Sequence, residues 1–411
     1  MKKIFGTLVT SENPEGIFYI QESLYKKISK EFDEFFIINL INFNLFKKKK
    51  LYKNKDSNNI LPHNFKIITP INEEELNKFL VDKNLVAFME FGKNLNNFKI
   101  QFLVKKYNIR LIYLQNTGAI GNQYLGKYFA GHRKTKIIRF YFFRLKKILT
   151  YFLLKVFIFF NLFSRIDIYF ESDKSIVDNC NNSLGKKIEK IFPFLKICYF
   201  KNIVHINARP FDMLTKNKLN LSEDKIVFID SNIESADITF REGKIDEQSK
   251  LEYFNQLSQF LLRLSNIFNK EIIICLHPKT DWDMYKKYLG KFELCKYQTS
   301  ENLKKAFIVV FHESTIIADA IFLKKKIISL KSEILGEYIS DRINYYEKQL
   351  GIFSYSLEEN KELNKNLLQT KLENITKNYD QYINNKIVSE DPTLGEDKII
   401  NTVRKEYIIN N

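Results

Sequence analysis

The sequence predicts an α/β protein made of two αβα domains in tandem, each built on a parallel sheet. Its 411 residues exceed one ordinary hydrophobic core and suit two domains of roughly 150 to 200 residues each. Hydrophobic residues form 45% of the chain, which is typical of a globular protein. Short β-branched or aromatic runs alternate with amphipathic stretches of helical spacing, the pattern of parallel strands joined by helices.

Residues 1–205 hold the first series of strands. The predicted strands are Lys3 to Val9, Phe35 to Ile41, Phe65 to Thr69, Leu85 to Glu90, Arg110 to Gln115 and Asp167 to Glu171. The apolar run that opens the chain is too short for a signal-peptide core, so it is expected to be the first strand. The four cysteines are scattered without a C-x-x-C pair, which indicates neither disulfides nor a cysteine-based metal site and fits a reducing cytoplasm.

Residues 206–356 repeat the pattern as a second domain, with the boundary near Pro210. The predicted strands are Lys225 to Asp230, Glu271 to Leu276, Phe307 to Phe311 and Lys326 to Leu330, and helices are expected over 247–268, around Asp283 to Leu289 and from Ser314 onward. Residues 357–411 are mostly polar and helical, and we expect this tail to pack back on the first domain.

A basic, apolar segment interrupts the first domain. The net charge of +17 is weak evidence by itself, because the whole composition leans towards Lys, Asn, Ile and Phe. Residues 133–165, however, contain nine Lys or Arg and no acid. The nearly apolar stretch 148–163 is shorter than the roughly 20 residues that cross a bilayer, so it predicts a helix lying on an anionic membrane surface. The alternative is an internal helix pair with a basic solvent face, and the basic run 46–56 either extends the patch or forms a solvated loop.

Two polar clusters follow strands of the second domain. His277-Pro278 ends one strand, and His312-Glu313-Ser314-Thr315 ends another. Ligands of open parallel sheets bind outside the carboxyl ends of the strands. One of the two hydroxyl residues could cap the next helix while its neighbour and the free backbone N–H groups bind a phosphate. Pro278 holds His277 in an extended conformation, where an imidazolium could bind phosphate or protonate a leaving group.

The sequence lacks the motifs of two common classes of nucleotide-binding enzyme. The chain has neither G-x-G-x-x-G nor G-x-x-x-x-G-K-[ST], which argues against a dinucleotide enzyme and a P-loop NTPase. Glu313 could hold a ribose hydroxyl pair or help to cap the helix, and Lys279 could help to neutralise the phosphate. No Asp-x-Asp triad stands at a strand end, so we expect no metal.

The motifs "HPK" and "HEST" resemble the HP and serine motifs of GT-B glycosyltransferases that use CMP-activated acid sugars, the bacterial sialyltransferases and Kdo transferases. The resemblance covers roughly residues 225–335. It implies a GT-B fold, two Rossmann-like αβα domains facing a central cleft. It also implies that His277 contacts the CMP phosphate and assists its departure, while Ser314 and Thr315 hold the same phosphate. CDP-glycerol glycerophosphotransferases are similar in this region and are the alternative.

An inverting transfer also needs a carboxylate base. Asp230, at the end of a strand, is the favoured candidate, although a turn-forming role is open to it. Glu90, ending a strand of the first domain, and Glu242 compete with it. The glycine-spaced stretch 115–134 offers Gly118, His132 and Arg133 for an anionic acceptor or lipid, or is a mobile loop.

The sequence therefore predicts a metal-independent inverting glycosyltransferase that needs no cofactor beyond its CMP-sugar substrate. The expected partners are the nucleotide sugar, a surface glycan or glycolipid acceptor and an anionic membrane, with the protein cytoplasmic and peripheral at the inner membrane. A nucleic-acid-binding protein is a rival suggested by the charge and the 15% aromatic content. It is disfavoured because the basic cluster is too apolar and no nucleic-acid module is present. A non-catalytic membrane scaffold is the third possibility.

Overall fold

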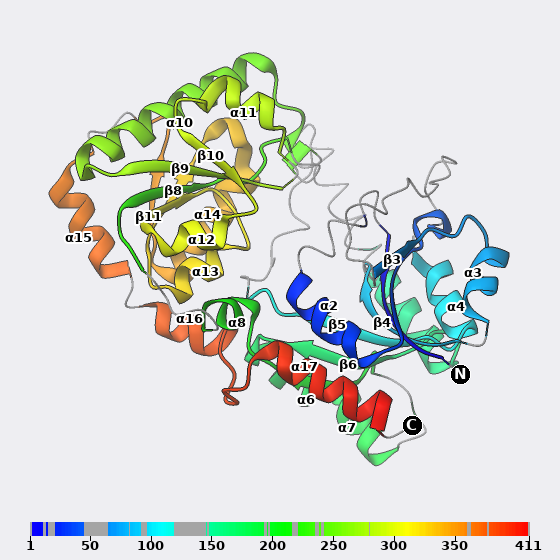
Figure 1. Cartoon of the computed structure of the whole chain (residues 1–411). Helices are drawn as coiled ribbons and strands as arrows, with labels where there is room; N and C mark the ends of the chain where they lie inside the picture. The colour runs from blue at the N-terminus through cyan, green and yellow to red at the C-terminus, as the bar shows by residue number, and fades with distance from the viewer. Residues whose placement is uncertain are drawn as a thin grey trace. The chain divides into compact units, whose positions relative to one another are not determined.

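The chain forms two compact α/β units in a computed structural model (Figure 1). The structure describes residues 2–10, 14, 21–44, 65–81, 83–91, 97–118, 145, 148–192, 195, 198–215, 221–234, 238–239, 242–278, 280–359, 363–375 and 378–409. Unit 1 comprises residues 1–116, 145–207 and 389–411, and unit 2 comprises 117–144 and 208–388.

Unit 1 is built on a seven-stranded parallel sheet in the order β3-β2-β1-β4-β5-β6-β7. Its strands are β1 (Lys2–Val9), β2 (Glu34–Asn39), β3 (Phe65–Ile68), β4 (Lys83–Glu90), β5 (Arg110–Gln115), β6 (Ile166–Glu171) and β7 (Phe200–His205). Its helices include α2 (Glu22–Ile28), α3 (Glu73–Leu80), α4 (Phe98–Lys106), α6 (Lys174–Asn181), α7 (Leu184–Ile191) and α17 (Gly395–Arg404). This order is that of a doubly wound sheet whose chain direction switches between β1 and β4.

Alternate residues of these strands enter different cores, as the two-residue period of a strand requires. Phe5 and Phe88 pack with α2 and α17 on one face, whereas Ile4 and Leu85 pack with α3 and α4 on the other. A Cβ atom at residue 6 would lie 2.7 Å from the carbonyl oxygen of Phe36 on β2, so a residue larger than glycine does not fit there. The close approach of β1 and β2 therefore depends on this glycine.

Unit 2 is built on a six-stranded parallel sheet in the order β10-β9-β8-β11-β12-β13. Its strands are β8 (Lys225–Ile229), β9 (Glu271–Leu276), β10 (Glu293–Lys296), β11 (Ala306–Phe311), β12 (Lys326–Lys331) and β13 (Phe353–Ser356). Its helices include α8 (Arg209–Thr215), α10 (Glu247–Phe268), α11 (Trp282–Leu289), α12 (Thr299–Lys304), α13 (Ile317–Phe322), α14 (Gly336–Leu350), α15 (Lys365–Ile375) and α16 (Tyr379–Lys386).

Local sequence explains where the helices around the second sheet begin. Asp246 caps α10 by accepting a 2.8 Å hydrogen bond from the backbone N–H of Ser249. Asp281 caps α11 by accepting from Asp283 at 2.9 Å. The strands between these helices are nearly continuous apolar runs, as expected of strands covered by helices on both faces.

The predicted fold class of two Rossmann-like αβα domains is confirmed by these two sheets. The predicted strands are present, but β7, β10 and β13 were not predicted. The chain crosses between the units at 116/117 and 144/145, passes again from unit 1 to unit 2 at 207/208, and returns at 388/389. Residues 357–388, the first part of the predicted tail, lie in unit 2, because Leu368 and Leu372 pack into its core.

The described part of the basic segment is a helix over residues 148–159. Leu154 and Ile158 pack against Phe98 of α4 and Phe163. The segment also exposes apolar side chains, which include Ile148, Leu149, Tyr151, Phe152, Phe159 and Phe160. A search of the described residues finds no helix with the length and hydropathy to span a membrane.

Candidate functional site

Three loops of unit 2 follow adjacent parallel strands. β8 lies at the centre of its sheet, with β9 on one side and β11 on the other. Asp230 follows β8, His277 follows β9, and His312 follows β11. Numbered within the unit, the strand order is 3-2-1-4-5-6, so the direction of winding switches between β8 and β11. The predicted site residues thus stand at the carboxyl ends of the strands at a topological switch point, where doubly wound sheets bind ligands.

Asp230 joins the loops after β8 and β9. Its side chain is 2% exposed and accepts four hydrogen bonds. The donors are the backbone N–H groups of Asn232 (2.9 Å) and His277 (3.0 Å) and the hydroxyl groups of Thr280 and Tyr285 (2.5 Å each). These bonds satisfy both carboxylate oxygens, as a buried carboxylate requires. The geometry gives Asp230 a role in holding the loops, and its predicted role as the base stays a prediction.

Ser231 joins the loops after β8 and β11. Its hydroxyl accepts a 3.0 Å hydrogen bond from the backbone N–H of Glu313 and donates a 2.6 Å bond to the carbonyl oxygen of the same residue. Adjacent residues 230 and 231 therefore fix both neighbouring loops. No local pattern indicates this role, because the partner of Ser231 lies 82 residues away.

His277 is half-buried at the end of β9 and Pro278 is exposed. The carbonyl oxygen of His277 accepts a 2.9 Å hydrogen bond from the backbone N–H of Thr280, which closes a tight turn. Both backbone polar groups of His277 are therefore held by the loop, through Asp230 and Thr280. Lys279, the third residue of the predicted motif, lies outside the described residues.

Glu313 forms an ion pair with Arg342 of α14, with Nη2 of the arginine 2.7 Å from Oε1. The arginine side chain is buried and also donates a 2.8 Å hydrogen bond to the hydroxyl of Tyr346, while its Nε has no hydrogen-bond partner among the described residues. The Glu313 side chain is 24% exposed, so its carboxylate keeps some access to a ligand. This ion pair was not predicted.

Ser314 is half-buried and Thr315 is exposed. The sequence predicts that one of them caps the following helix, but α13 begins at Ile317, and its cap position, Ile316, provides no side-chain cap. The chain first makes two turns in which Ile317 N–H bonds to the carbonyl of Ser314 and Ala318 N–H to that of Thr315, each at 3.3 Å. The hydroxyl of Ser314 accepts a long 3.4 Å bond from Ile316.

His312 is a completely buried histidine that was not assigned a role from the sequence. Its Nδ1 lies 2.6 Å from the carbonyl oxygen of Leu330, and its Nε2 lies 2.7 Å from the hydroxyl of Tyr253. Because a carbonyl only accepts, Nδ1 carries the proton and Nε2 accepts from the tyrosine. Burial lowers the pKa of His312 to about 4, so it is neutral and structural.

Glu242 holds the N-terminus of α14. Its carboxylate accepts a 2.8 Å hydrogen bond from the backbone N–H of Tyr338. Gly336, with φ of +82°, has no room for a side chain, because a Cβ atom there would lie 2.4 Å from the Glu242 carboxylate. The hydrogen bond pairs a backbone N–H that the first turn of the helix leaves without an intrahelical partner. The carboxylate of Glu242, a competing candidate for the base, is therefore used in a structural contact.

Glu90 and Gly118 are the described members of the predicted acceptor site. Glu90 is the last residue of β4, and part of its side chain is exposed to solvent. The surrounding protein still removes water from the carboxyl group, and this desolvation raises the pKa of Glu90 to about 7. Gly118 is buried in unit 2; its carbonyl accepts a hydrogen bond from Tyr382, and it packs against Ala208 and Ile387. His132 and Arg133 lie outside the described residues.

A second carboxyl group of unit 1 was missed from the sequence. Glu171 ends β6 and is 1% exposed. Burial raises its pKa to about 7, while hydrogen bonds from the hydroxyl of Tyr169 and the backbone N–H of Asp173 oppose that shift. Buried carboxyl groups with raised pKa values at strand ends are candidates for proton transfer near neutral pH.

Two cavities lined by described residues lie away from these loops. One cavity of about 100 Å³ lies along α10 and β13, next to Arg263 and Tyr355. Another, of about 390 Å³, is lined by Asn202 of β7 and Thr402 of α17. Over the described ranges, no three His, Cys, Asp or Glu side chains gather as metal ligands would.

No protein-family model matches this sequence, and no curated protein matches it. Solved structures give low similarity over nearly the whole chain. A variant of the wall teichoic acid polymerase TagF soaked with CDPG has 12% identity, covers 98% of this chain and 88% of its own, and has a TM-score of 0.49. A putative UDP-N-acetylglucosamine 2-epimerase from Listeria monocytogenes has 12% identity, coverages of 99% and 96%, and a TM-score of 0.47. The calicheamicin glycosyltransferase CalG4 has 7% identity, coverages of 99% and 99%, and a TM-score of 0.44.

Proposed function

We propose that this protein is a GT-B-type transferase that moves a group from a cytidine-nucleotide donor to an acceptor hydroxyl. In this proposal His277 contacts the donor phosphate and assists departure of the nucleotide. Ser314 and Thr315 bind the same phosphate, and Glu313 binds the ribose hydroxyl pair.

One observation carries the proposal: a histidine, a carboxylate and a hydroxyl pair stand at the carboxyl ends of β9 and β11, on either side of β8. The loops that bear them are cross-linked through Asp230 and Ser231. Such cross-links hold a site in its binding geometry before the ligand arrives, which lowers the entropy that binding must overcome.

Two donors fit the motif pair. A CMP-linked acid sugar would give a glycoside and release CMP, whereas CDP-glycerol would give a phosphodiester and also release CMP. The acid-sugar donor is the reading that the sialyltransferase and Kdo-transferase resemblance favours, and the glycerophosphate donor is its alternative. Both predict selective recognition of cytidine.

Thermal unfolding with CMP, CDP, UDP and GDP tests the nucleotide. A ligand at 100 times its dissociation constant stabilises the folded state by about 2.7 kcal/mol. CMP or CDP should raise the melting temperature while UDP and GDP should not; a shift by UDP or GDP alone would contradict the proposal. Incubation with CMP-sialic acid, CMP-Kdo and CDP-glycerol then separates the donors by the mass added to the acceptor.

Glu90 and Glu171 of unit 1 are candidates for the base alongside Asp230, because both have a pKa of about 7. We further propose that the acceptor is a glycan or glycolipid reached at an anionic membrane surface through the exposed side of the 148–159 helix. Its exposed apolar side chains and Lys155 suit the boundary between acyl chains and head groups.

A further inference from the structure

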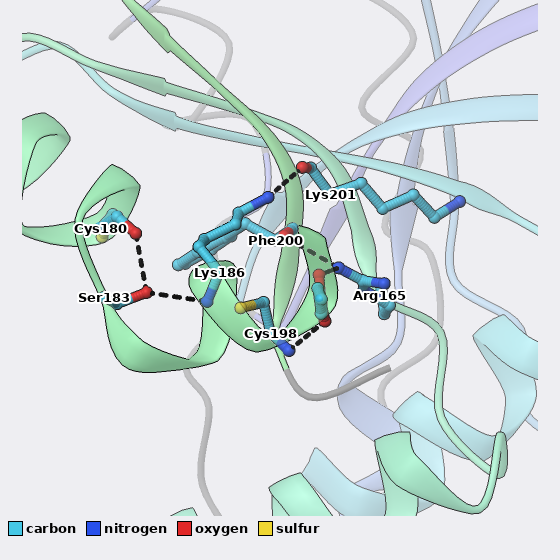
Figure 2. Close-up of polar contacts among 8 residues, drawn as sticks. Arg165, Cys180, Ser183, Lys186, Cys198, Phe200 and Lys201 are labelled. Carbon is cyan, nitrogen blue, oxygen red and sulfur yellow. Dashed lines mark hydrogen bonds and ion pairs between the residues drawn. The ribbon is translucent and has the colours of Figure 1, made fainter. Parts of the chain in front are cut away.

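Helix α7 is anchored to unit 1 at its beginning by side-chain contacts. The hydroxyl of Ser183 caps the helix by accepting a 3.3 Å hydrogen bond from the backbone N–H of Lys186, and it donates a 2.8 Å bond to the carbonyl oxygen of Cys180 at the end of α6 (Figure 2). A capped N-terminus fixes where this eight-residue helix starts.

The polar side of α7 faces the protein. Lys186 and Glu189 are three residues apart and so share one side of the helix. The ammonium of Lys186 donates to the carbonyl oxygen of Lys201 on β7 (Figure 2). Glu189 accepts from Arg165 at 2.9 Å and from the backbone N–H of Cys198 at 2.6 Å. The arginine and glutamate side chains are 14% and 13% exposed, so this is a largely desolvated ion pair rather than a surface contact.

The apolar side of α7 faces away from the protein. Leu184, Ile188 and Ile191 are spaced by four and three residues, which places them on one stripe, roughly opposite Glu189. Leu184 is 73% exposed and Ile191 is 70% exposed, and no residue of α7 is buried. A surface helix of a globular protein has the reverse orientation, with its apolar stripe on the core. The stripe continues into Phe192, which is 47% exposed.

The charge that remains on the outer part of α7 is positive. Lys187 and Lys190 are exposed, and the helix contains one acid, Glu189, whose carboxylate is used in the inward ion pair. Apolar side chains bordered by lysines are the composition of helices that lie in the head-group region of anionic membranes.

We propose that α7 docks on an anionic bilayer, with the exposed Leu184, Ile191 and Phe192 entering the acyl boundary beside the half-buried Ile188, and with Lys187 and Lys190 contacting anionic head groups. A second copy of the chain is a poorer occupant, because pairing two such faces would bring like charges together. An eight-residue helix is also only about 12 Å long, too short to supply the roughly 800 Å² per partner of a standard protein interface. The inference concerns α7 alone and does not depend on transferase activity.

Sedimentation of the full chain with vesicles tests the proposal. Lys187→Gln with Lys190→Gln should weaken binding to vesicles containing 30% phosphatidylserine by about thirtyfold, which corresponds to about 1 kcal/mol for each charge. Binding to pure phosphatidylcholine should not change. Leu184→Ser with Ile191→Ser should weaken binding to both kinds of vesicle by about tenfold. The melting temperature should stay the same in every variant, since the replaced groups are exposed.

Leu251→Ser on α10, a leucine that is 48% exposed, is the matched control and should leave vesicle binding unchanged. The depth to which α7 enters the bilayer is an independent measurement. With Trp282→Phe in place, Phe192→Trp provides a single tryptophan, and brominated lipids should quench its fluorescence. Unchanged binding of both double variants, or a Phe192→Trp signal that brominated lipids do not quench, would overturn the proposal. Loss of a dimer in light scattering with unchanged vesicle binding would overturn it in favour of a second copy.

Discussion

Oδ2 of Asp230 accepts a 3.0 Å hydrogen bond from the backbone N–H of His277, across the ends of two adjacent strands. The bond connects a buried carboxylate to the backbone of the histidine proposed to contact the donor. Because the other Asp230 bonds reach Thr280 and Tyr285, removing this carboxylate would release the whole loop after β9. Burial also keeps the tyrosine protonated, since it raises the pKa of Tyr285 well above its usual value.

Asp230→Ala should therefore lower the free energy of unfolding of unit 2 by about 4 kcal/mol, because it leaves several buried donors unpaired. The matched variant Tyr285→Phe removes one donor and should cost about 1 kcal/mol. Urea unfolding followed by the fluorescence of Trp282, the single tryptophan of the chain, reports on this unit. Unchanged stability of Asp230→Ala would contradict this structural role.

His277→Ala should leave the fold nearly intact and reduce turnover by roughly 10² to 10⁴, the range for a lost general acid or phosphate contact. The backbone N–H that bonds to Asp230 is retained in this variant, and the side chain is only half-buried. Activity and melting temperature should be measured together. Full activity, or collapse of the fold, would remove His277 from the site.

Ser314→Ala should mainly weaken nucleotide binding, because the one hydrogen bond of its hydroxyl found among the described residues is long, at 3.4 Å. The double variant with His277→Ala should lose less than the sum of the two separate effects, since both groups act on one phosphate. Isothermal titration with CMP gives the binding part of this cycle. Strict additivity would mean that the two residues do not share a ligand.

The parts of the fold that local sequence specifies were predicted. β8, β9, β11 and β12 are runs of β-branched and other apolar residues buried on both faces, so their composition identifies them. β10 and β13 are four-residue strands at the two edges of the sheet, and β7 lies at the edge of the other sheet. Edge strands pair on one side only, so they need no continuous apolar run, and propensity alone did not reveal them.

Only the positions of the candidate residues could be predicted, because strand ends determine them. His277 and Ser314 follow buried strands, as expected, and their roles in binding stay predictions. The bonds that organise the loops could not, because Asp230 reaches partners 47 to 55 residues away and Ser231 reaches a backbone 82 residues away. The outward orientation of α7 is similarly invisible in its sequence, since an amphipathic pattern does not say which side is anchored.

Glu171 should make unit 1 less stable as the pH rises towards 7. Its pKa is about 7 in the folded chain and about 4.3 in an unfolded one, so the folded state binds more protons between these values. Its contribution is fully present below pH 4.3 and is lost by about pH 7, a change of about 4 kcal/mol. Relative to the parent, Glu171→Gln should therefore gain stability over that range.

Hydrogen exchange of the amides in β6 measures this difference between the parent and Glu171→Gln at pH 4.5 and 7.5. Glu74→Gln, which replaces an exposed carboxylate on α3, is the control and should track the parent at both pH values. A pH-independent difference between the parent and Glu171→Gln would contradict the raised pKa.

His312 should make unit 2 less stable as the pH falls, which is the opposite pH dependence to that of Glu171. Burial lowers its pKa to about 4, below the roughly 6.5 of an unfolded histidine, so the unfolded state binds more protons between pH 4 and 6.5. The stability of unit 2 therefore falls by about 3 kcal/mol as the pH drops through this window, and the loss levels off below pH 4.

His312→Asn cannot take up that proton and should lack this part of the pH dependence. It should also be less stable than the parent at pH 7, where the bonds to Tyr253 and Leu330 are weakened or lost. Urea unfolding followed by Trp282 fluorescence at pH 7 and 4.5 measures this difference: the gap in stability between parent and variant should narrow on acidification. A constant gap would mean that the pKa of His312 is not lowered in the folded chain.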